Sequence, residues 1–221
     1  MNKVMATEHN IKRIWDLPTR VFHWALVLTV FSSFISVKIG GNAMIWHSRF
    51  GYAALALILF RVIWGVIGSY HSRFVNFIKG PKSVLNYLKS SEETPGHSPI
   101  GALSVLLILG LFGIQAISGL FASDEIFFDG PLVKYTSSFW VELLTSLHRL
   151  NEYLLIGVVA IHILAIIFYK IVKRNDLITP MFTGDKLWMK KIPVSRDDLT
   201  TRIQASTIAI LIGLSLYYFL R

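Results

Sequence analysis

Apolar residues in this chain are gathered into five long runs, separated by shorter polar and charged connections. A helix needs about 20 predominantly apolar residues to cross the hydrocarbon layer of a membrane, and each run is close to that length or longer. We expect all five to be helices, because only helices and closed barrels satisfy every backbone polar group in lipid. Their expected bounds are approximately residues 19–37, 45–67, 100–121, 140–172 and 203–220.

The composition agrees with this pattern. Hydrophobic residues make up 53% of the 221-residue chain and charged residues only 16%, whereas about a quarter of the residues in soluble domains are charged. The expected fold class is therefore an all-α membrane protein. No cysteine is present, which excludes disulfides, thiolate metal sites, iron–sulfur clusters and covalent attachment of a c-type haem. We expect no cleavable signal sequence, because about twenty polar and mixed residues precede the first apolar run.

The formal net charge of +9 comes from basic residues concentrated in alternate connections, so no nucleic-acid partner is expected. These residues are Lys3, Lys12, Arg13 and Arg20, then Arg73, Lys79, Lys82 and Lys89, and finally Lys170, Lys173, Arg174, Lys186, Lys190, Lys191 and Arg196. The other connections are the short "KIGGNAM" and an acidic segment with Asp124, Glu125 and Asp129. The positive-inside rule then predicts a multi-pass membrane protein with its N-terminus in the cytoplasm and its C-terminus outside.

One basic connection, residues 74–89, mixes aromatic and aliphatic residues with lysines. This pattern is consistent with a short helix that lies in the cytoplasmic interface of the membrane. An ordinary basic loop explains it equally well, and the sequence leaves both alternatives open.

Four histidines lie within the apolar runs: His23, His47, His148 and His162. Ionisable residues inside a membrane are costly, usually face the interior of the helix bundle and tend to be functional. A single histidine of this kind is as readily explained by a structural hydrogen bond between helices. Four such histidines call for a joint explanation.

The depths of these histidines suggest two pairs. His148 and His162 are fourteen residues apart on one helix, which places them roughly 21 Å apart and within about 40° of the same face. With the predicted orientation, His47 and His148 lie at the outer level and His23 and His162 at the inner level. Iron in haem takes two axial imidazoles, and helical bundles build cofactor sites from facing side chains. We therefore predict two bis-histidine b-type haems, an outer one on His47 and His148 and an inner one on His23 and His162.

Further residues stand near the histidine levels. Gly51, one turn after His47, would let a porphyrin approach the helix closely. Arginine side chains could pair with haem propionates, and the candidates are Arg20, Arg49, Arg61 and Arg149. For Arg20 and Arg149, extension of the side chain to the lipid headgroups is an equally good explanation.

Several segments resemble the bacterial cytochrome b561 family, which is related to the cytochrome b subunits of formate dehydrogenases and hydrogenases. They are "RVFHWALVL", "IWHSRFGYAALALILFRVIWG", "LLTSLHRLNEYLLIGVVAIHILAIIFYK" and "NDLITPMFTGDK". The resemblance implies a four-helix haem-binding bundle over residues 1–187, haem ligation by His23, His47, His148 and His162, and electron exchange with quinone. It also implies that the membrane is the bacterial inner membrane, so that the predicted outer C-terminus would be periplasmic. Residues 188–221 depart from the family, because they add a basic linker and a fifth transmembrane helix without histidine.

The protein has three candidate functions. The first is a di-haem cytochrome that carries electrons between the quinone pool and a periplasmic redox protein such as a c-type cytochrome. The second is the membrane-anchor cytochrome b subunit of a larger dehydrogenase or hydrogenase. The third, a metal-ion or proton transporter, predicts ligands converging on one site, whereas these histidines divide into two distant pairs. Quinone oxidoreductase activity of the chain itself and homodimerisation are left open.

Overall fold

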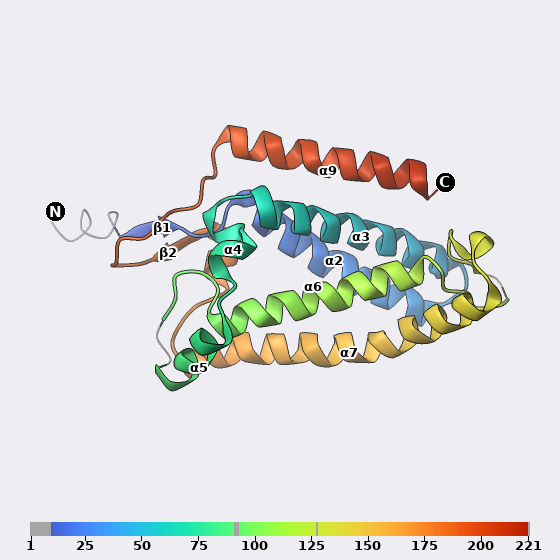
Figure 1. Cartoon of the computed structure of the whole chain (residues 1–221), viewed down its shortest axis with the longest axis horizontal. Coiled ribbons are helices and arrows are strands. Elements are labelled where there is room, and N and C mark those ends of the chain that lie inside the picture. Colours follow the sequence, from blue (N-terminus) through green and yellow to red (C-terminus); the bar gives the residue numbers. More distant parts are fainter. Residues whose placement is uncertain (1–9, 91–92, 127, 221) are drawn as a thin grey trace. The chain divides into compact units, whose positions relative to one another are not determined.

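The computed structural model describes residues 10–90, 93–126 and 128–220. Within these residues, five helices are long and apolar enough to cross a membrane, and the predicted all-α membrane fold is confirmed. They are α2 (Leu17–Ile39), α3 (Met44–Ile67), α6 (Pro99–Gly119), α7 (Ser138–Ile171) and α9 (Leu199–Phe219), as labelled in Figure 1. Each begins and ends within a few residues of the bounds expected from the apolar runs, because burial in lipid requires the whole run to be helical.

The connection at residues 74–89 is helical but interrupted. It forms α4 (Phe74–Phe77) and α5 (Pro81–Ser90), with Gly80 just before the second helix. In α5, Leu85 and Leu88 are exposed on one side while Lys82 and Lys89 extend from another. This amphipathic arrangement agrees with the interfacial-helix alternative rather than with an irregular loop.

The sequence did not indicate two short strands that pair with each other. β1 (Ile11–Arg13) is antiparallel to β2 (Asp185–Leu187), with Lys12 opposite Lys186, and the two lie side by side in Figure 1. β2 directly follows the short helix α8 (Thr179–Thr183), which ends at Gly184 in a left-handed conformation with φ of 88°. Strands of three residues are too short to show an alternating hydrophobic pattern. They join the segment before α2 to the segment before the C-terminal linker.

The structure divides into two units, each with its own dense internal contacts. Unit 1 contains the described residues of 1–21, 61–106 and 162–206, and unit 2 contains those of 22–60, 107–161 and 207–221. Each long helix contributes residues to both units. The division predicted from sequence, with a second part beginning at residue 188, stays a prediction.

A buried carboxylate organises unit 1. Asp16 has no exposed surface, and it accepts hydrogen bonds from the Thr19 backbone N–H at 2.9 Å, from Trp64 Nε1 at 3.0 Å and from the Ser72 hydroxyl at 3.1 Å. The first of these bonds caps the start of α2, and the second attaches that start to the last turns of α3. A buried charge is tolerated only when it is hydrogen-bonded in this way. Asp16 therefore sets where α2 begins relative to α3.

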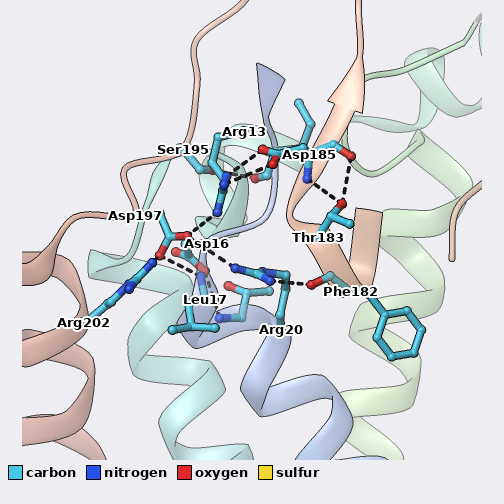
Figure 2. Close-up of polar contacts among 12 residues, drawn as sticks. Arg13, Asp16, Leu17, Arg20, Phe182, Thr183, Asp185, Ser195, Asp197 and Arg202 are labelled. Atoms are coloured by element: carbon cyan, nitrogen blue, oxygen red, sulfur yellow. Dashed lines mark hydrogen bonds and ion pairs between the residues drawn. The ribbon is translucent and has the colours of Figure 1, made fainter. Parts of the chain in front are cut away.

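A second carboxylate, Asp197, connects the C-terminal linker to the N-terminal segment (Figure 2). Its side chain is only 7% exposed, and it pairs with Arg13 and, at 3.2 Å, with Arg202 Nε. It also accepts the Leu17 N–H at 3.1 Å. Burial raises the pKa of Asp197, but the hydrogen bonds from Arg202 and Leu17 and the nearby positive charges lower it by more, so the net pKa lies below its ordinary value.

Other contacts hold the same linker. The Ser195 hydroxyl donates to the Ile14 carbonyl at 2.6 Å, and His71 Nε2 lies 2.9 Å from the Pro193 carbonyl. Arg13, which pairs with Asp197, also contacts Asp185 of β2 through two nitrogens at 2.7 and 3.1 Å. The linker that precedes α9 is therefore an integral part of unit 1.

A histidine is enclosed in the aromatic part of unit 1. The His97 ring lies 4.3 Å from the Phe77 ring and 4.7 Å from the Trp15 ring, measured between centroids. The residue as a whole keeps some exposed surface, but its Nδ1 atom is buried and no described residue hydrogen-bonds to that atom. Burial, together with the positive charges of Arg61 and His71, lowers the pKa of His97 to about 3.

Removing the Asp197 carboxylate should loosen the linker. In Asp197→Ala, the guanidinium groups of Arg13 and Arg202 lose a largely buried partner, and such charged hydrogen bonds each contribute about 1.5–3 kcal/mol. We expect trypsin to cleave after Lys190, Lys191 and Arg196 about tenfold faster than in the native protein. The matched control is Asp198→Ala, because Asp198 only caps α9 through the Thr201 N–H; equal cleavage of both variants would refute the role of Asp197.

The neutral state of His97 should make stability depend on pH. Its pKa is lowered in the folded protein from an ordinary value of 6.5, so between pH 6.5 and 3 the unfolded chain binds one more proton than the folded protein. The free energy of unfolding should therefore fall as the pH drops below about 6.5, by about 2 kcal/mol between pH 7.5 and pH 5. Thermal unfolding in detergent at both values measures this effect. In His97→Phe, which keeps an aromatic ring, the difference should shrink by that amount, and an unchanged pH dependence would contradict the assignment.

Candidate functional site

Two histidines from different helices face one another in unit 2. His47 lies in the first turns of α3 and His148 in the first half of α7. Their ring centroids are 6.2 Å apart and their planes are nearly perpendicular, at 88°. The residues are far apart in the sequence, and the structure brings together the two that were expected to form the outer pair.

Both rings are held through the same nitrogen. His47 Nδ1 lies 3.0 Å from the Ser33 carbonyl of α2, and His148 Nδ1 lies 2.9 Å from the Gln115 carbonyl of α6. A carbonyl oxygen can only accept a hydrogen bond, so each Nδ1 carries a proton, and in the neutral imidazole Nε2 then keeps its lone pair. A hydrogen bond at one ring nitrogen orients the other nitrogen for metal binding. Both rings are therefore held as metal-binding histidines are, through Nδ1.

The separation of the rings fits one metal ion between them. Metal–imidazole bonds of about 2.0–2.1 Å and a ring radius of about 1.1 Å place two opposed centroids roughly 6.3 Å apart, close to the value found here. Among the described residues, no group of three or more His, Asp or Glu could hold a bare metal ion. A site with two protein ligands is what an iron porphyrin requires, because the macrocycle supplies the remaining ligands.

Sequence reasoning missed the residues around His148. Gln115, Ser118 and Gly119 of α6 lie against its ring, and Asn151 of α7 donates a hydrogen bond to the Gln115 side chain. A Cβ atom on Gly119 would lie 2.9 Å from His148 Cε1, so only glycine leaves room for the imidazole in this orientation. The signal for Gln115 and Asn151 was present, since amides within apolar runs are rare and need partners. Which partners they have could not be read from the sequence.

The residues of the predicted inner pair belong to different units. His23 lies in α2 within unit 2, where it is half-buried and its ring meets Trp24 edge-on at 4.9 Å. His162 lies in α7 within unit 1 and is also half-buried. The pairing of these two histidines stays a prediction from the sequence.

Arg61 is the most buried of the arginines named from the sequence. It is 2% exposed, and its guanidinium lies over the Phe74 ring at 4.7 Å and near the Phe77 ring at 5.9 Å. Its Nη1 atom is buried without a hydrogen-bond partner among the described residues. A buried guanidinium with an unused donor can accept an anionic group such as a carboxylate.

The other named residues have different surroundings. Arg20 donates to the Phe182 carbonyl and pairs with Asp197 at 3.4 Å (Figure 2). Arg49 is exposed and lies over the Trp46 ring at 4.9 Å, and Arg149 is exposed beside His148. Gly51 has open space where a Cβ would lie. The roles of these residues toward a cofactor stay predictions.

The chain is similar to known proteins over most of its length. The sequence profile of the prokaryotic cytochrome b561 family matches residues 14–184. A probable Ni/Fe-hydrogenase B-type cytochrome subunit from Rhizobium leguminosarum bv. viciae is 22% identical in an aligned region of 219 residues, gaps included. This region covers 83% of this chain and 92% of that protein. No solved structure matches the chain significantly. The expected resemblance is confirmed. The protein belongs to the prokaryotic cytochrome b561 family and is a multi-pass membrane b-type cytochrome that takes part in electron transfer.

Proposed function

We propose that this protein is a di-haem cytochrome that carries electrons across the bacterial inner membrane. The observation that carries the proposal is the His47–His148 pair, whose spacing and protonation suit two axial ligands of one haem. The inner haem on His23 and His162 rests on the depths of these residues in the sequence. Two haems separated by roughly 21 Å along the membrane normal would form a path for electrons from one side to the other.

The residues of the chain perform the holding and positioning. His47 and His148 present Nε2 lone pairs, and the carbonyls of Ser33 and Gln115 keep both rings oriented. Haem, when bound, supplies one-electron chemistry at its iron. Arg61, at the depth of the inner pair along α3, would pair its free Nη1 donor with a propionate.

The electron partners follow from the predicted orientation. Quinone would exchange electrons with the protein from within the membrane, and a periplasmic redox protein would dock at the acidic segment between α6 and α7. In that segment the Asp124 carboxylate accepts the N–H groups of Ile126 and Phe128, so it shapes the turn. Glu125 and Asp129 are exposed, and they could attract a basic partner such as a c-type cytochrome.

A second candidate function has support from the comparison. The relative from Rhizobium leguminosarum is described as a probable hydrogenase cytochrome subunit, and it matches nearly its whole length. On this alternative, the present chain would anchor a catalytic subunit in the membrane and pass its electrons to quinone. Both functions use the same haems, and co-purification of a catalytic subunit from the native membrane would favour the second.

The haem content distinguishes the proposed ligands. The purified protein should hold two b-type haems per chain by pyridine haemochrome assay, with the sharp reduced bands of low-spin iron. His148→Ala should lose the outer haem alone and His162→Ala the inner one, so each variant should retain one haem per chain. A folded single variant that retains none, or both, would overturn the pairing; circular dichroism and gel filtration identify variants that fail to fold.

Gly119 offers a test that leaves every ligand in place. In Gly119→Ala the new methyl group would press on the His148 ring, so we expect weaker binding of the outer haem and about half of the native haem content after mild chromatography. Gly113→Ala in the same helix is the matched control, because nothing lies within 4 Å of its Cβ position. Equal haem content in the two variants would show that Gly119 does not shape the outer site.

A further inference from the structure

A buried amide lies one turn from the outer histidine. Asn151 follows His148 by three residues on α7 and is only 2% exposed. Its Nδ2 donates to the Leu111 carbonyl at 2.9 Å and to Gln115 Oε1 at 2.8 Å, both on α6. An amide in an apolar helix is costly unless its hydrogen bonds are made. Asn151 therefore attaches α7 to α6 at the level of His148.

Gln115 is the residue that connects this amide to the histidine. Its backbone carbonyl accepts the His148 Nδ1–H at 2.9 Å. Its side-chain oxygen is occupied by Asn151, which turns the amide nitrogen toward His148, and Gln115 Nε2 lies 3.1 Å from His148 Nε2. Because Asn151 can donate only through its nitrogen, this arrangement defines the orientation of both amides. Hydrogen bonds therefore run from Asn151 through Gln115 to the imidazole. When His148 Nε2 binds iron it no longer accepts from Gln115 Nε2, and the bond from Nδ1–H to the Gln115 carbonyl is the one that remains.

A serine of α6 also contacts the His148 ring. The Ser118 hydroxyl lies 3.2 Å from His148 Nδ1 and donates to the Ile114 carbonyl at 2.6 Å. His47 is held in the same way at Nδ1, where the carbonyl and the hydroxyl of Ser33 both lie 3.0 Å away. What distinguishes His148 is Gln115, whose side chain is fixed by Asn151 and whose carbonyl meets the imidazole.

We propose that Asn151 and Gln115 are positioning residues that set the reduction potential of the outer haem through His148. This inference rests on the proposed haem ligation by His148. A hydrogen bond from Nδ1–H to a carbonyl makes the imidazole a stronger donor, and stronger donation stabilises oxidised iron. By holding α6 against α7, Asn151 keeps the Gln115 carbonyl within reach of Nδ1. The amide therefore lowers the potential of the outer haem.

The test is potentiometric titration of the purified two-haem protein in detergent. Asn151→Leu keeps the volume of the side chain and removes its donors. We expect about a tenfold rise in the reduced-to-oxidised ratio of the outer haem at a fixed potential, which is about 59 mV for one electron. The inner haem should not change. His148→Ala identifies which of the two transitions belongs to the outer haem, because that transition should be missing there.

Two control variants and one substitute for Asn151→Leu complete the design. Asn151→Gln retains an amide donor and should restore most of the native potential, whereas Ser146→Ala, at an exposed position on the same helix, should change neither haem. If Asn151→Leu loses haem, Asn151→Ala, which removes the donors without adding a larger apolar group, is titrated in its place. An unchanged outer potential, or an equal shift in both haems, would overturn this inference. A native protein without two haems would instead overturn the proposed function.

Discussion

Polar groups inside the apolar helices must find hydrogen-bond partners within the chain, because lipid offers none. This constraint accounts for the arrangement around His148, where an imidazole, two amides and a hydroxyl satisfy one another between α6 and α7. It also accounts for His47, whose Nδ1–H donates a hydrogen bond to the Ser33 carbonyl of α2. The same bonds that satisfy these groups select the tautomer whose Nε2 keeps a lone pair. A requirement of folding in lipid thereby prepares both rings to bind a metal.

Unit 1 meets a related requirement with charges. Asp16 is fully buried and accepts three hydrogen bonds, one of which begins α2. Asp197 brings the C-terminal linker to the same region and contacts Arg13, Arg20 and the first residue of α2. The family match ends at residue 184, so Asp197 lies beyond the matched residues. Its contacts attach this C-terminal segment to the start of the first long helix, α2.

Electron transfer by a b-type cytochrome leaves the protein few chemical tasks, because the haem carries the electron. A b-type cytochrome needs the protein to hold haem, orient its ligands and adjust the electronic character of the iron. On the proposed ligation, His47 and His148 of unit 2 would supply the ligands of the outer haem, and Gln115 and Asn151 would adjust His148. Because these two amides lie beside the outer site, they would change its potential without altering that of the inner haem. Such a difference is what directs electrons along a chain of carriers.

The sequence by itself determined the class of protein, the five helices and the four histidines, because apolar length and intramembrane ionisable residues report directly on lipid and on function. It also indicated, through helical spacing, that His47 and His148 would share a level. Only the tertiary structure decided what surrounds them: that the Gln115 carbonyl meets His148, that Gly119 leaves space for its ring, and that Asp197 reaches Arg13. Local patterns record the period of a helix and the solvent it faces, but they carry no information about which distant segment supplies a hydrogen-bond partner. That choice depends on how the helices pack, and packing is set by many weak contacts at once.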